Sequence, residues 1–361
     1  MPPSGIDQRS LKVEPADRAH ALPAHFYCDP AILAAEHERV FARSWQLLAP
    51  ADLVREPGDH AVSQIGRTPV LVVRDPQQCL HGLHNVCRHR AGPLALENGR
   101  GARALHCKYH GWTYSLDGQL RAAPEMQEAQ DFEVSKICLP RFRVEAWQDL
   151  VFGTLDAAGP GLSEVLEGIA ARAGEIFSRP LRYFRRVQYE LDCNWKVYVD
   201  NYLEGYHLPH IHPELNRLLD YRSYQTECSR WSSLQHAPLE DASGLYGNGG
   251  AYYFFVFPNT MLNILPGRLQ TNRVIPLGVN RCRVDFDYYY ADLPADEQTL
   301  ARQDQDQAFS DRVQAEDATI CAAVQKGLAS GSYVSGRLSP SRERGVKHFH
   351  DLLRTAYATA S

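Results

Sequence analysis

The sequence predicts an α+β protein in which a small all-β domain precedes a larger domain of helices and strands. Two observations lead to this prediction. Between residues 45 and 155, short apolar segments with strand-like alternation are separated by turn residues. Beyond residue 156, long segments with helical periodicity alternate with strand-like segments. A chain of 361 residues is long enough for two domains, each with its own hydrophobic core.

The composition is that of an ordinary globular protein, with 44% hydrophobic and 22% charged residues. The formal net charge of −5 argues against nucleic acid as a partner. No apolar run approaches the length of a membrane span, and Met1–Lys12 lack the apolar core of a signal peptide. We therefore expect a cytoplasmic protein that acts neither on nucleic acid nor at a membrane.

Residues 1–44 are expected to form a loose polar segment and one helix that packs on the larger domain. Asp29 and Pro30 are typical of a helix N-terminus, and apolar residues recur at helical spacing through about Phe41. The all-β domain covers residues 45–155. Its clearest strands are predicted at 60–65, 69–74 and 151–155.

Residues 156–361 are expected to form the second domain. Its elements are predicted as the helix Leu162–Phe177, the strand Tyr183–Leu191, the helix Trp195–Tyr206, several strands within 218–290 that include Tyr252–Phe257 and Val284–Tyr290, the long polar helix Asp296–Gly327 and the terminal helix Ser341–Ala358.

Two Cys–His pairs stand in the all-β domain: Cys87 with His89, and Cys107 with His110. A Rieske [2Fe–2S] cluster needs such a set, because one iron is bound by two thiolates and the other by two imidazoles. A Cys2His2 zinc site uses the same ligands but usually pairs like with like. The pairing of unlike ligands favours the cluster. The other seven cysteines have no framework spacing and are expected to be buried or free thiols: Cys28, Cys79, Cys138, Cys193, Cys228, Cys282 and Cys321.

The segments 85–90 and 107–114 closely resemble the cluster motif of the Rieske non-haem iron oxygenases, alpha subunit. Ala91 is a departure, because the family usually has Gly at that place. The resemblance covers nearly the whole chain. It implies a Rieske [2Fe–2S] domain over 45–155, inserted into a helix-grip (START/Bet v 1-like) catalytic domain over 156–361 that binds mononuclear iron.

Three histidines within six residues follow in the second domain: His207, His210 and His212. We expect them in a helix that Pro209 distorts. A non-haem Fe(II) oxygenase needs two His and one carboxylate, with positions left open for O2 and substrate. The family pattern Asn-x-x-acid-x-x-His-x-x-x-x-His-Pro implies that His207 and His212 are iron ligands, whereas His210 matches no ligand position.

The carboxylate ligand is expected on the long polar helix. The candidate acids are Asp304, Asp306, Asp311, Glu316 and Asp317. A solvated acidic face explains most of them. In the family the ligand is the Asp of a Glu-Asp pair that leads into an apolar helix. This implies Asp317, with Glu316 as the alternative.

Two further residues match the family motif. The resemblance implies that Glu204 hydrogen-bonds histidines of the cluster and of the iron site across a subunit boundary, and so fixes their tautomers. Most members carry Asp there, and a solvated helix acid is the alternative interpretation. Asn201 matches a residue near the iron.

The resemblance also implies a terminal oxygenase with one [2Fe–2S] cluster and one Fe(II) per chain. Electrons would come from NAD(P)H through a separate flavin/iron–sulfur reductase, since this sequence has no flavin or nicotinamide motif. A chain's own cluster and iron would lie too far apart for fast transfer, which implies a head-to-tail homotrimer. A Rieske electron carrier is the alternative of another class, but it would end near residue 155.

The substrate is the least determined expectation. Glu204 and the segments 257–261, 324–328 and 336–337 resemble the branch that contains choline, carnitine and glycine-betaine monooxygenases. Aromatic residues expected at the pocket walls could hold a quaternary ammonium by cation–π attraction: Tyr202, Tyr206, Tyr252, Tyr253, Phe254, Phe255 and Phe257. Core packing and aromatic substrates explain such residues as well. We expect hydroxylation or oxidative C–N cleavage of a quaternary-ammonium compound, with ring hydroxylation or O-demethylation of an aromatic acid as the alternative.

Overall fold

The computed structural model describes residues 6–176, 180–239, 245–246, 249–291 and 293–358. The chain folds into two compact units: Phe41–Leu162, and Met1–Val40 together with Ser163–Ser361. The smaller unit is therefore inserted into the larger one along the chain. It extends beyond the expected 45–155 at both ends. Within it, the indole N–H of Trp45 donates to the Pro160 carbonyl at 2.9 Å, and the Gln46 side chain donates to the Phe41 carbonyl at 2.7 Å.

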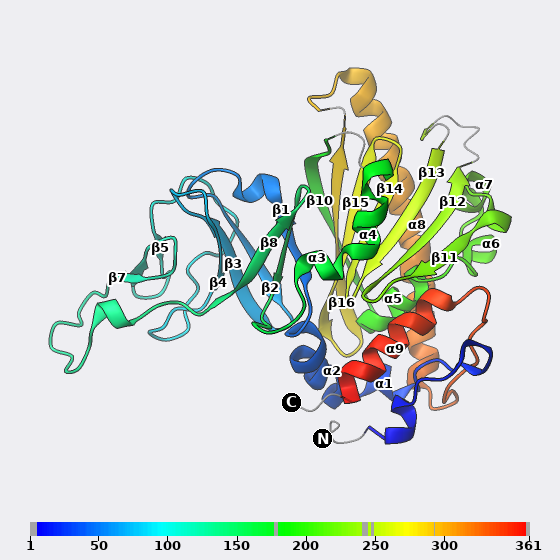
Figure 1. Ribbon diagram of the computed structural model, residues 1–361, viewed down its shortest axis with the longest axis horizontal. Coiled ribbons are helices and arrows are strands. Elements are labelled where there is room, and N and C mark those ends of the chain that lie inside the picture. Colours follow the sequence, from blue (N-terminus) through cyan, green and yellow to red (C-terminus); the bar gives the residue numbers. More distant parts are fainter. Residues whose placement is uncertain (1–5, 177–179, 240–244, 247–248, 292, 359–361) are drawn as a thin grey trace. The chain divides into compact units, whose positions relative to one another are not determined.

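The smaller unit is all-β, as predicted (Figure 1). Its antiparallel six-stranded sheet has the order β1-β9-β8-β4-β3-β2 and a second, three-stranded sheet has the order β5-β6-β7. The strands are β1 Gln46–Pro50, β2 His60–Ile65, β3 Thr68–Arg74, β4 Leu80–His84, β5 Leu105–His106, β6 Thr113–Tyr114, β7 Leu120–Ala122, β8 Arg141–Trp147 and β9 Leu150–Thr154. Apolar residues of β3 and the loops around β5 and β6 share one buried cluster that includes Cys87 and Cys107.

The larger unit is built on an antiparallel seven-stranded sheet of order β10-β16-β15-β14-β13-β12-β11. Its strands are β10 Arg182–Leu191, β11 Gln225–Cys228, β12 Ser232–Leu239, β13 Gly249–Val256, β14 Thr260–Leu265, β15 Arg268–Gly278 and β16 Arg281–Tyr290. The long helix α8 (Glu297–Ala329) lies behind this sheet in Figure 1, and α4 (Glu167–Ile176) lies in front of it. A long helix on a curved antiparallel sheet is the expected helix-grip arrangement.

The N-terminal helices belong to the larger unit. They are α1 (His25–Cys28) and α2 (Pro30–Glu36), and the chain continues as a π-helical turn to Phe41. As predicted, α2 begins at Pro30, because the Asp29 side chain accepts a hydrogen bond from the Ala31 N–H at 2.8 Å. At its end the fully buried Glu36 accepts hydrogen bonds from Lys196 and Trp195, at 2.6 and 2.7 Å. These bonds attach the N-terminal segment to helix α5.

The histidine segment differs from the prediction of one helix distorted by Pro209, which was wrong. Helix α5 (Trp195–Tyr202) ends at Tyr202, and two short helices follow, α6 (Leu208–Ile211) and α7 (Pro213–Leu218). Gly205 sits in the turn after α5, where a Cβ atom would come within 2.9 Å of the Tyr224 ring. Pro209 stands in the first turn of α6, where a missing N–H costs nothing. The proline therefore helps to start a new helix.

Other element boundaries differ less. The expected helix Leu162–Phe177 is divided into α3 (Leu162–Val165) and α4, and Phe177 lies outside the described residues. The long helix begins after Asp296, which caps it through the Thr299 N–H at 2.8 Å. The terminal helix α9 is Arg344–Ala358.

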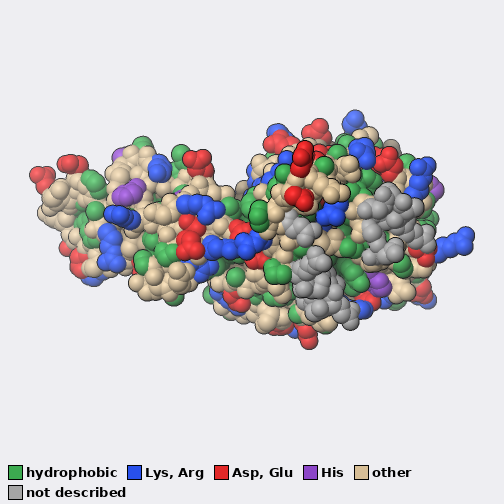
Figure 2. Space-filling model, turned by 90° about the horizontal axis from the view of Figure 1, so that it is seen from above, with side chains coloured by type: hydrophobic (Ala, Val, Ile, Leu, Met, Phe, Trp, Pro, Cys, Tyr) green, Lys and Arg blue, Asp and Glu red, His purple; other side chains and the backbone are tan. Residues whose placement is uncertain are grey.

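The remaining expectations concern cysteines, membranes and surface charge. All nine cysteines are free thiols, including Cys193 and Cys282, whose sulfur atoms lie 3.9 Å apart. Among the described helices, none has both the length and the apolar character that crossing a bilayer requires. On the face shown in Figure 2, acidic and basic side chains of the described residues are interspersed.

Candidate metal centres

The two Cys–His pairs lie in two loops of similar backbone geometry. In the first loop the Ala91 N–H donates to the Cys87 carbonyl, and in the second the Gly111 N–H donates to the Cys107 carbonyl, both at 3.1 Å. Ala91 and Gly111 both have positive φ, +57° and +74°. Ala91 therefore adopts the left-handed conformation that glycine would adopt more easily, at a cost of about 1–2 kcal/mol. The departure from the family motif changes the loop's strain but leaves the ligand positions intact.

The side chains of the two loops converge. The rings of His89 and His110 lie 4.6 Å apart between centroids, and His89 stacks on Trp112. The thiols of Cys87 and Cys107 are buried. The Tyr114 hydroxyl lies 3.2 Å from the Cys87 sulfur, and burial raises the pKa of this phenol far enough that it stays a hydrogen-bond donor.

Two observations fit an iron–sulfur cluster at this place. The Nδ1 atom of His89 is buried and has no hydrogen-bond partner among the described residues, as a metal-binding nitrogen requires. At Gly92, a Cβ atom would come within 2.9 Å of the Cys107 sulfur, so the absence of a side chain leaves space beside that thiol. Both observations are compatible with the predicted cluster ligands Cys87, His89, Cys107 and His110.

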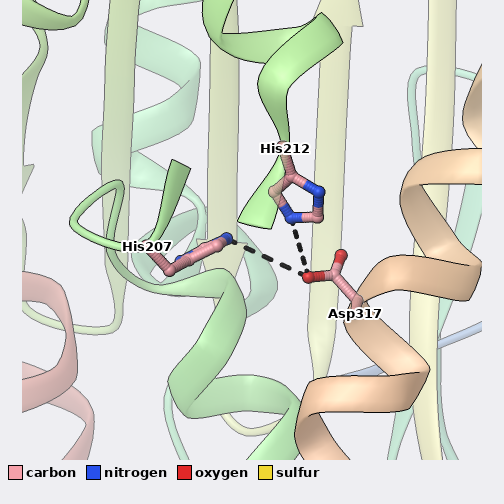
Figure 3. Close-up of side chains that lie close together, drawn as sticks. All are labelled: His207, His212 and Asp317. Carbon is pink, nitrogen blue, oxygen red and sulfur yellow. Dashed lines mark hydrogen bonds and ion pairs between the residues drawn. The ribbon is translucent and has the colours of Figure 1, made fainter. Parts of the chain in front are cut away.

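The second centre joins His207, His212 and Asp317 (Figure 3). One ligand atom from each lies within 4.8 Å of the others. His207 and His212 flank the short helix α6, and Asp317 projects from α8. The Oδ1 atom of Asp317 lies 3.0 Å from Nε2 of His212 and 3.9 Å from Nε2 of His207. Two imidazoles and one carboxylate that converge in this way form the ligand set of a mononuclear Fe(II) site.

Two glutamates hold the other nitrogens of these rings. Nδ1 of His207 lies 2.7 Å from Glu204, and Nδ1 of His212 lies 2.7 Å from Glu316. With the proton on Nδ1, both Nε2 lone pairs are directed toward Asp317 and remain free to bind metal. The motif implied Asp317 as the ligand, with Glu316 as the alternative. In the structure Glu316 faces the outer nitrogen of His212, so the geometry favours Asp317.

The electrostatics of the ring nitrogens are set by these acids. Burial lowers the pKa of His212, but the carboxylates of Asp317 and Glu316 outweigh burial and raise it. Because the Asp317 carboxylate faces Nε2 of His212, proton binding and metal binding compete at that nitrogen. Asn201 donates a hydrogen bond to Oδ1 of Asp317 at 2.6 Å, which orients that carboxylate. His210 is exposed and lies outside the group, as the motif implied.

The acids of α8 do not all form a solvated face. Asp304 is exposed, but Asp306 is 3% exposed and pairs with Arg268 on β15. Asp311 accepts a hydrogen bond from Tyr189. The buried ion pair could not be predicted from the sequence, because its partners belong to different elements.

His207, His212 and Asp317 are called the iron-binding group below. These three residues and Glu204 line a cavity. It offers about 130 Å³ to the centres of water-sized molecules. One water molecule needs about 10–15 Å³ on this measure, so the cavity is large enough for a small organic molecule.

The prediction of its aromatic walls was only partly right. Tyr202 and Tyr253 line the cavity, whereas Tyr206, Tyr252, Phe254, Phe255 and Phe257 do not. Successive side chains of a strand point to opposite faces, so Tyr253 of β13 faces the cavity and its neighbours do not. The missed aromatic residues are Tyr198, Tyr224, Tyr246, Phe286 and Phe309. Helical spacing could have revealed two of them, because Tyr198 precedes Tyr202 by four residues and Phe309 precedes Asp317 by eight.

Comparisons with known proteins agree with this geometry. Residues 44–139 match the family model of the Rieske [2Fe-2S] domain, and residues 178–359 match that of the ring hydroxylating alpha subunit (catalytic domain). The chain is 37% identical to chloroplastic choline monooxygenase of Arabidopsis thaliana, over 94% of this chain and 83% of the relative. It is 29% identical to the carnitine monooxygenase oxygenase subunit of Escherichia coli (strain K12), over 94% of each.

A solved structure has the same fold. It is that of a quaternary ammonium Rieske monooxygenase, described as giving insights into carnitine oxidation and inter-subunit electron transfer. The TM-score is 0.88 at 24% identity, over 98% of this chain and 100% of that chain. A Rieske electron carrier would lack the second matched domain. The chain therefore belongs to the Rieske non-haem iron oxygenases, as a ring-hydroxylating alpha subunit with a [2Fe–2S] domain and a catalytic domain of the mononuclear-iron type.

Proposed function

We propose that this oxygenase oxidises a C–H bond next to the nitrogen of a small quaternary-ammonium substrate. The observation that carries the proposal is a cavity lined by several tyrosines that opens directly on His207, His212 and Asp317. Tyrosine faces attract a cation that has lost its water shell. The family relatives named for choline and carnitine act on substrates of this charge.

The chain's own residues have separate tasks. Cys87, His89, Cys107 and His110 would hold the cluster, and the two histidines with Asp317 would hold Fe(II). When bound, these groups would supply two electrons and activate O2. One oxygen atom would be inserted into the C–H bond, and the other would take up two protons and leave as water. An N-methyl group oxidised in this way becomes N-hydroxymethyl, which releases formaldehyde and the tertiary amine.

The cavity walls bind and orient the substrate. The single O–H of Tyr202 lies within hydrogen-bond distance of two acceptors, the Phe254 carbonyl at 3.1 Å and Oδ1 of Asn263 at 2.8 Å, so the position of its ring is fixed. Burial raises the pKa of Tyr202 and Tyr224 well above the usual value, so both phenols stay neutral. Rigid neutral aromatic walls favour an ammonium group with methyl substituents over a strongly hydrated cation.

Electron supply would require partners. We infer a separate NAD(P)H-dependent flavin/iron–sulfur reductase and a homotrimer in which electrons pass from the cluster of one subunit to the iron of the next. Glu204 supports the second inference, because it already binds Nδ1 of His207 and is 13% exposed at its side chain, so it remains open to a further donor. A cytoplasmic location stays a prediction, since the Arabidopsis relative is named as chloroplastic.

The test is coupled O2 consumption with a surrogate reductase. Choline, carnitine, betaines and N-methylated prolines would be compared with benzoate- and vanillate-type acids, with the product identified by mass. We expect O2 uptake and formaldehyde or an aldehyde product only with compounds of the first group. Exclusive turnover of an anionic aromatic acid would reject the proposal in favour of ring hydroxylation or O-demethylation.

A further inference from the structure

A buried guanidinium lines the same cavity. Arg268 begins β15 and is 6% exposed, and its Nε atom lies 2.8 Å from Oδ2 of Asp306. Burial alone would lower the pKa of Arg268, but Asp306 outweighs burial and raises it, so the group is charged. The hydroxyls of Tyr246 and Tyr290 also donate to Asp306, at 2.8 and 2.6 Å. A charged side chain is thus held at the wall of a cavity that is otherwise mainly aromatic and aliphatic.

The pair lies at a distance from the iron-binding group. Asp306 and Asp317 are both on α8, and eleven residues separate them. Eleven residues make about three helical turns, so the two acids share one face of α8 and lie about 16 Å apart along its axis. Phe309, Val313 and Gln314 line the cavity on the turns between them. The cavity therefore has a metal end and an arginine end.

Not all N–H groups of Arg268 are used in hydrogen bonds to the described residues. Nη2 donates to Gln270, the next residue on the same face of β15. The N–H at Nε is close enough to Asp306 for an ion pair but is not aligned as a hydrogen bond. Among the residues that the structure describes, Nη1 has no hydrogen-bond partner. A planar guanidinium with unused N–H groups is suited to bind a carboxylate in two-point fashion.

Tyrosines connect the two ends. Tyr224, Tyr253 and Arg268 all line the cavity; Tyr253 helps to raise the pKa of Tyr224, and the Arg268 cation acts on the phenol of Tyr253. Tyr224 and Tyr253 in turn help to raise the pKa of Tyr202, which lines the cavity together with the iron-binding group. One aromatic wall therefore runs from the metal end toward Arg268. A ligand with a cationic head and an anionic tail would place the head on this wall and the tail on the arginine.

We propose that Arg268 binds the carboxylate of the substrate, so that the enzyme acts on trimethylammonium carboxylates rather than on simple ammonium cations such as choline. This inference rests on the proposed function and makes it more specific. Without a carboxylate, N–H donors of Arg268 would stay unpaired, and the ammonium head would share the cavity with a cation that only Asp306 neutralises. With one, the substrate's own two charges pair with the two ends of the cavity.

The test compares matched substrate pairs that differ only in the carboxylate. Glycine betaine is paired with choline, and γ-butyrobetaine with (4-hydroxybutyl)trimethylammonium. In the wild type we expect kcat/KM for at least one carboxylate to exceed that of its alcohol about 10- to 100-fold, the range of a charge-assisted hydrogen bond. In R268Q this preference should disappear through a higher KM for the carboxylate. R268K keeps the positive charge but lacks the planar set of N–H donors, and it should retain only part of the preference for the carboxylate.

The controls separate binding from folding. R283Q removes an arginine of the neighbouring strand β16 that pairs with Asp285 at 2.8 Å outside the cavity, and it should keep the full preference. The double variant R268Q/D306N removes both buried charges, and it should match R268Q if the loss is one of recognition. Iron content and thermal unfolding are measured for each variant.

The outcomes are distinct. A wild type that uses the alcohols as well as the carboxylates would overturn the role of Arg268 and leave the quaternary-ammonium function standing. A wild type that turns over neither pair but oxidises vanillate would overturn the proposed function itself. A folded R268Q with unchanged carboxylate preference would assign the pair to structure alone.

Discussion

Replacing the two neighbouring acids of α8 separately should weaken iron binding to very different degrees. Asp317→Ala removes the carboxylate that approaches both Nε2 atoms. Glu316→Ala removes only the acceptor for Nδ1 of His212. We expect Asp317→Ala to lose the mononuclear iron and all turnover, while Glu316→Ala keeps iron at high metal concentration and binds it more weakly.

The magnitude for Glu316 follows from its surroundings. Loss of an acceptor behind a metal-bound histidine usually costs 10- to 100-fold in metal affinity. The Glu316 side chain is 42% exposed, so water replaces part of its interaction with His212. We expect the lower limit, about tenfold, or about 1.4 kcal/mol. Glu316→Gln keeps an oxygen acceptor and should lose less. Asp304→Asn, an exposed acid of the same helix, is the control and should change nothing.

The assay is iron per chain after dialysis against graded concentrations of a chelator, with the visible spectrum of the cluster as an internal reference. The wild type should hold three iron atoms and Asp317→Ala two, with an unchanged cluster spectrum. If Asp317→Ala keeps three atoms and activity while Glu316→Ala loses both, the ligand assignment is wrong.

Three further predictions concern the cluster, the assembly and pH. Cys87→Ser or His110→Ala should abolish the low-average-g signal of the reduced Rieske centre, and a colourless wild type that copurifies with zinc would contradict the cluster. Glu204→Gln should slow electron transfer while both metal centres stay intact. Co-expressed Cys87→Ser and His207→Ala chains should regain part of the activity if electrons cross between subunits. Confirmed mixed trimers without activity would exclude such transfer. Burial lowers the pKa of His348, so below about pH 6.5 the unfolded state binds more protons than the folded state. The unfolding free energy should therefore decrease as the pH is lowered through this range. His348→Gln should flatten that dependence in urea titrations at each pH, and an unchanged slope would assign it to other groups.

The cluster site could be proposed from the sequence because its predicted ligands are local. Cys87 and His89 are two residues apart, and the second pair repeats the arrangement on an equivalent turn. The backbone detail was not readable, because the positive φ of Ala91 depends on how the loop closes on Cys87.

The candidate ligands of the mononuclear iron could not be chosen from residue spacing alone. His212 and Asp317 are 105 residues apart, and helical periodicity alone does not say which acid of α8 faces the histidines. The resemblance to a known motif supplied that choice. The end of α5 was missed because the helical pattern continues to Tyr206, while the chain turns where Gly205 packs against Tyr224. Tertiary packing overrode the local signal there.

Arg268 was missed for a similar reason. Nothing in the sequence near Arg268 marks it as buried, and its partner Asp306 resembles the exposed acids on either side of it. Only the meeting of β15 with α8 brings the two together at the cavity wall.

A single-turnover reaction shows whether the iron held by His207, His212 and Asp317 oxidises an N-methylated carboxylate. The enzyme is reduced chemically without any reductase, freed of reductant, and given one pulse of 18O2 with a trimethylammonium carboxylate. We predict up to one oxidised product per mononuclear iron, with 18O in the initial product, reoxidation of the cluster, and no product from Asp317→Ala. Reoxidation of the cluster without product for every N-methylated compound, or product formation that persists in Asp317→Ala, would contradict this prediction.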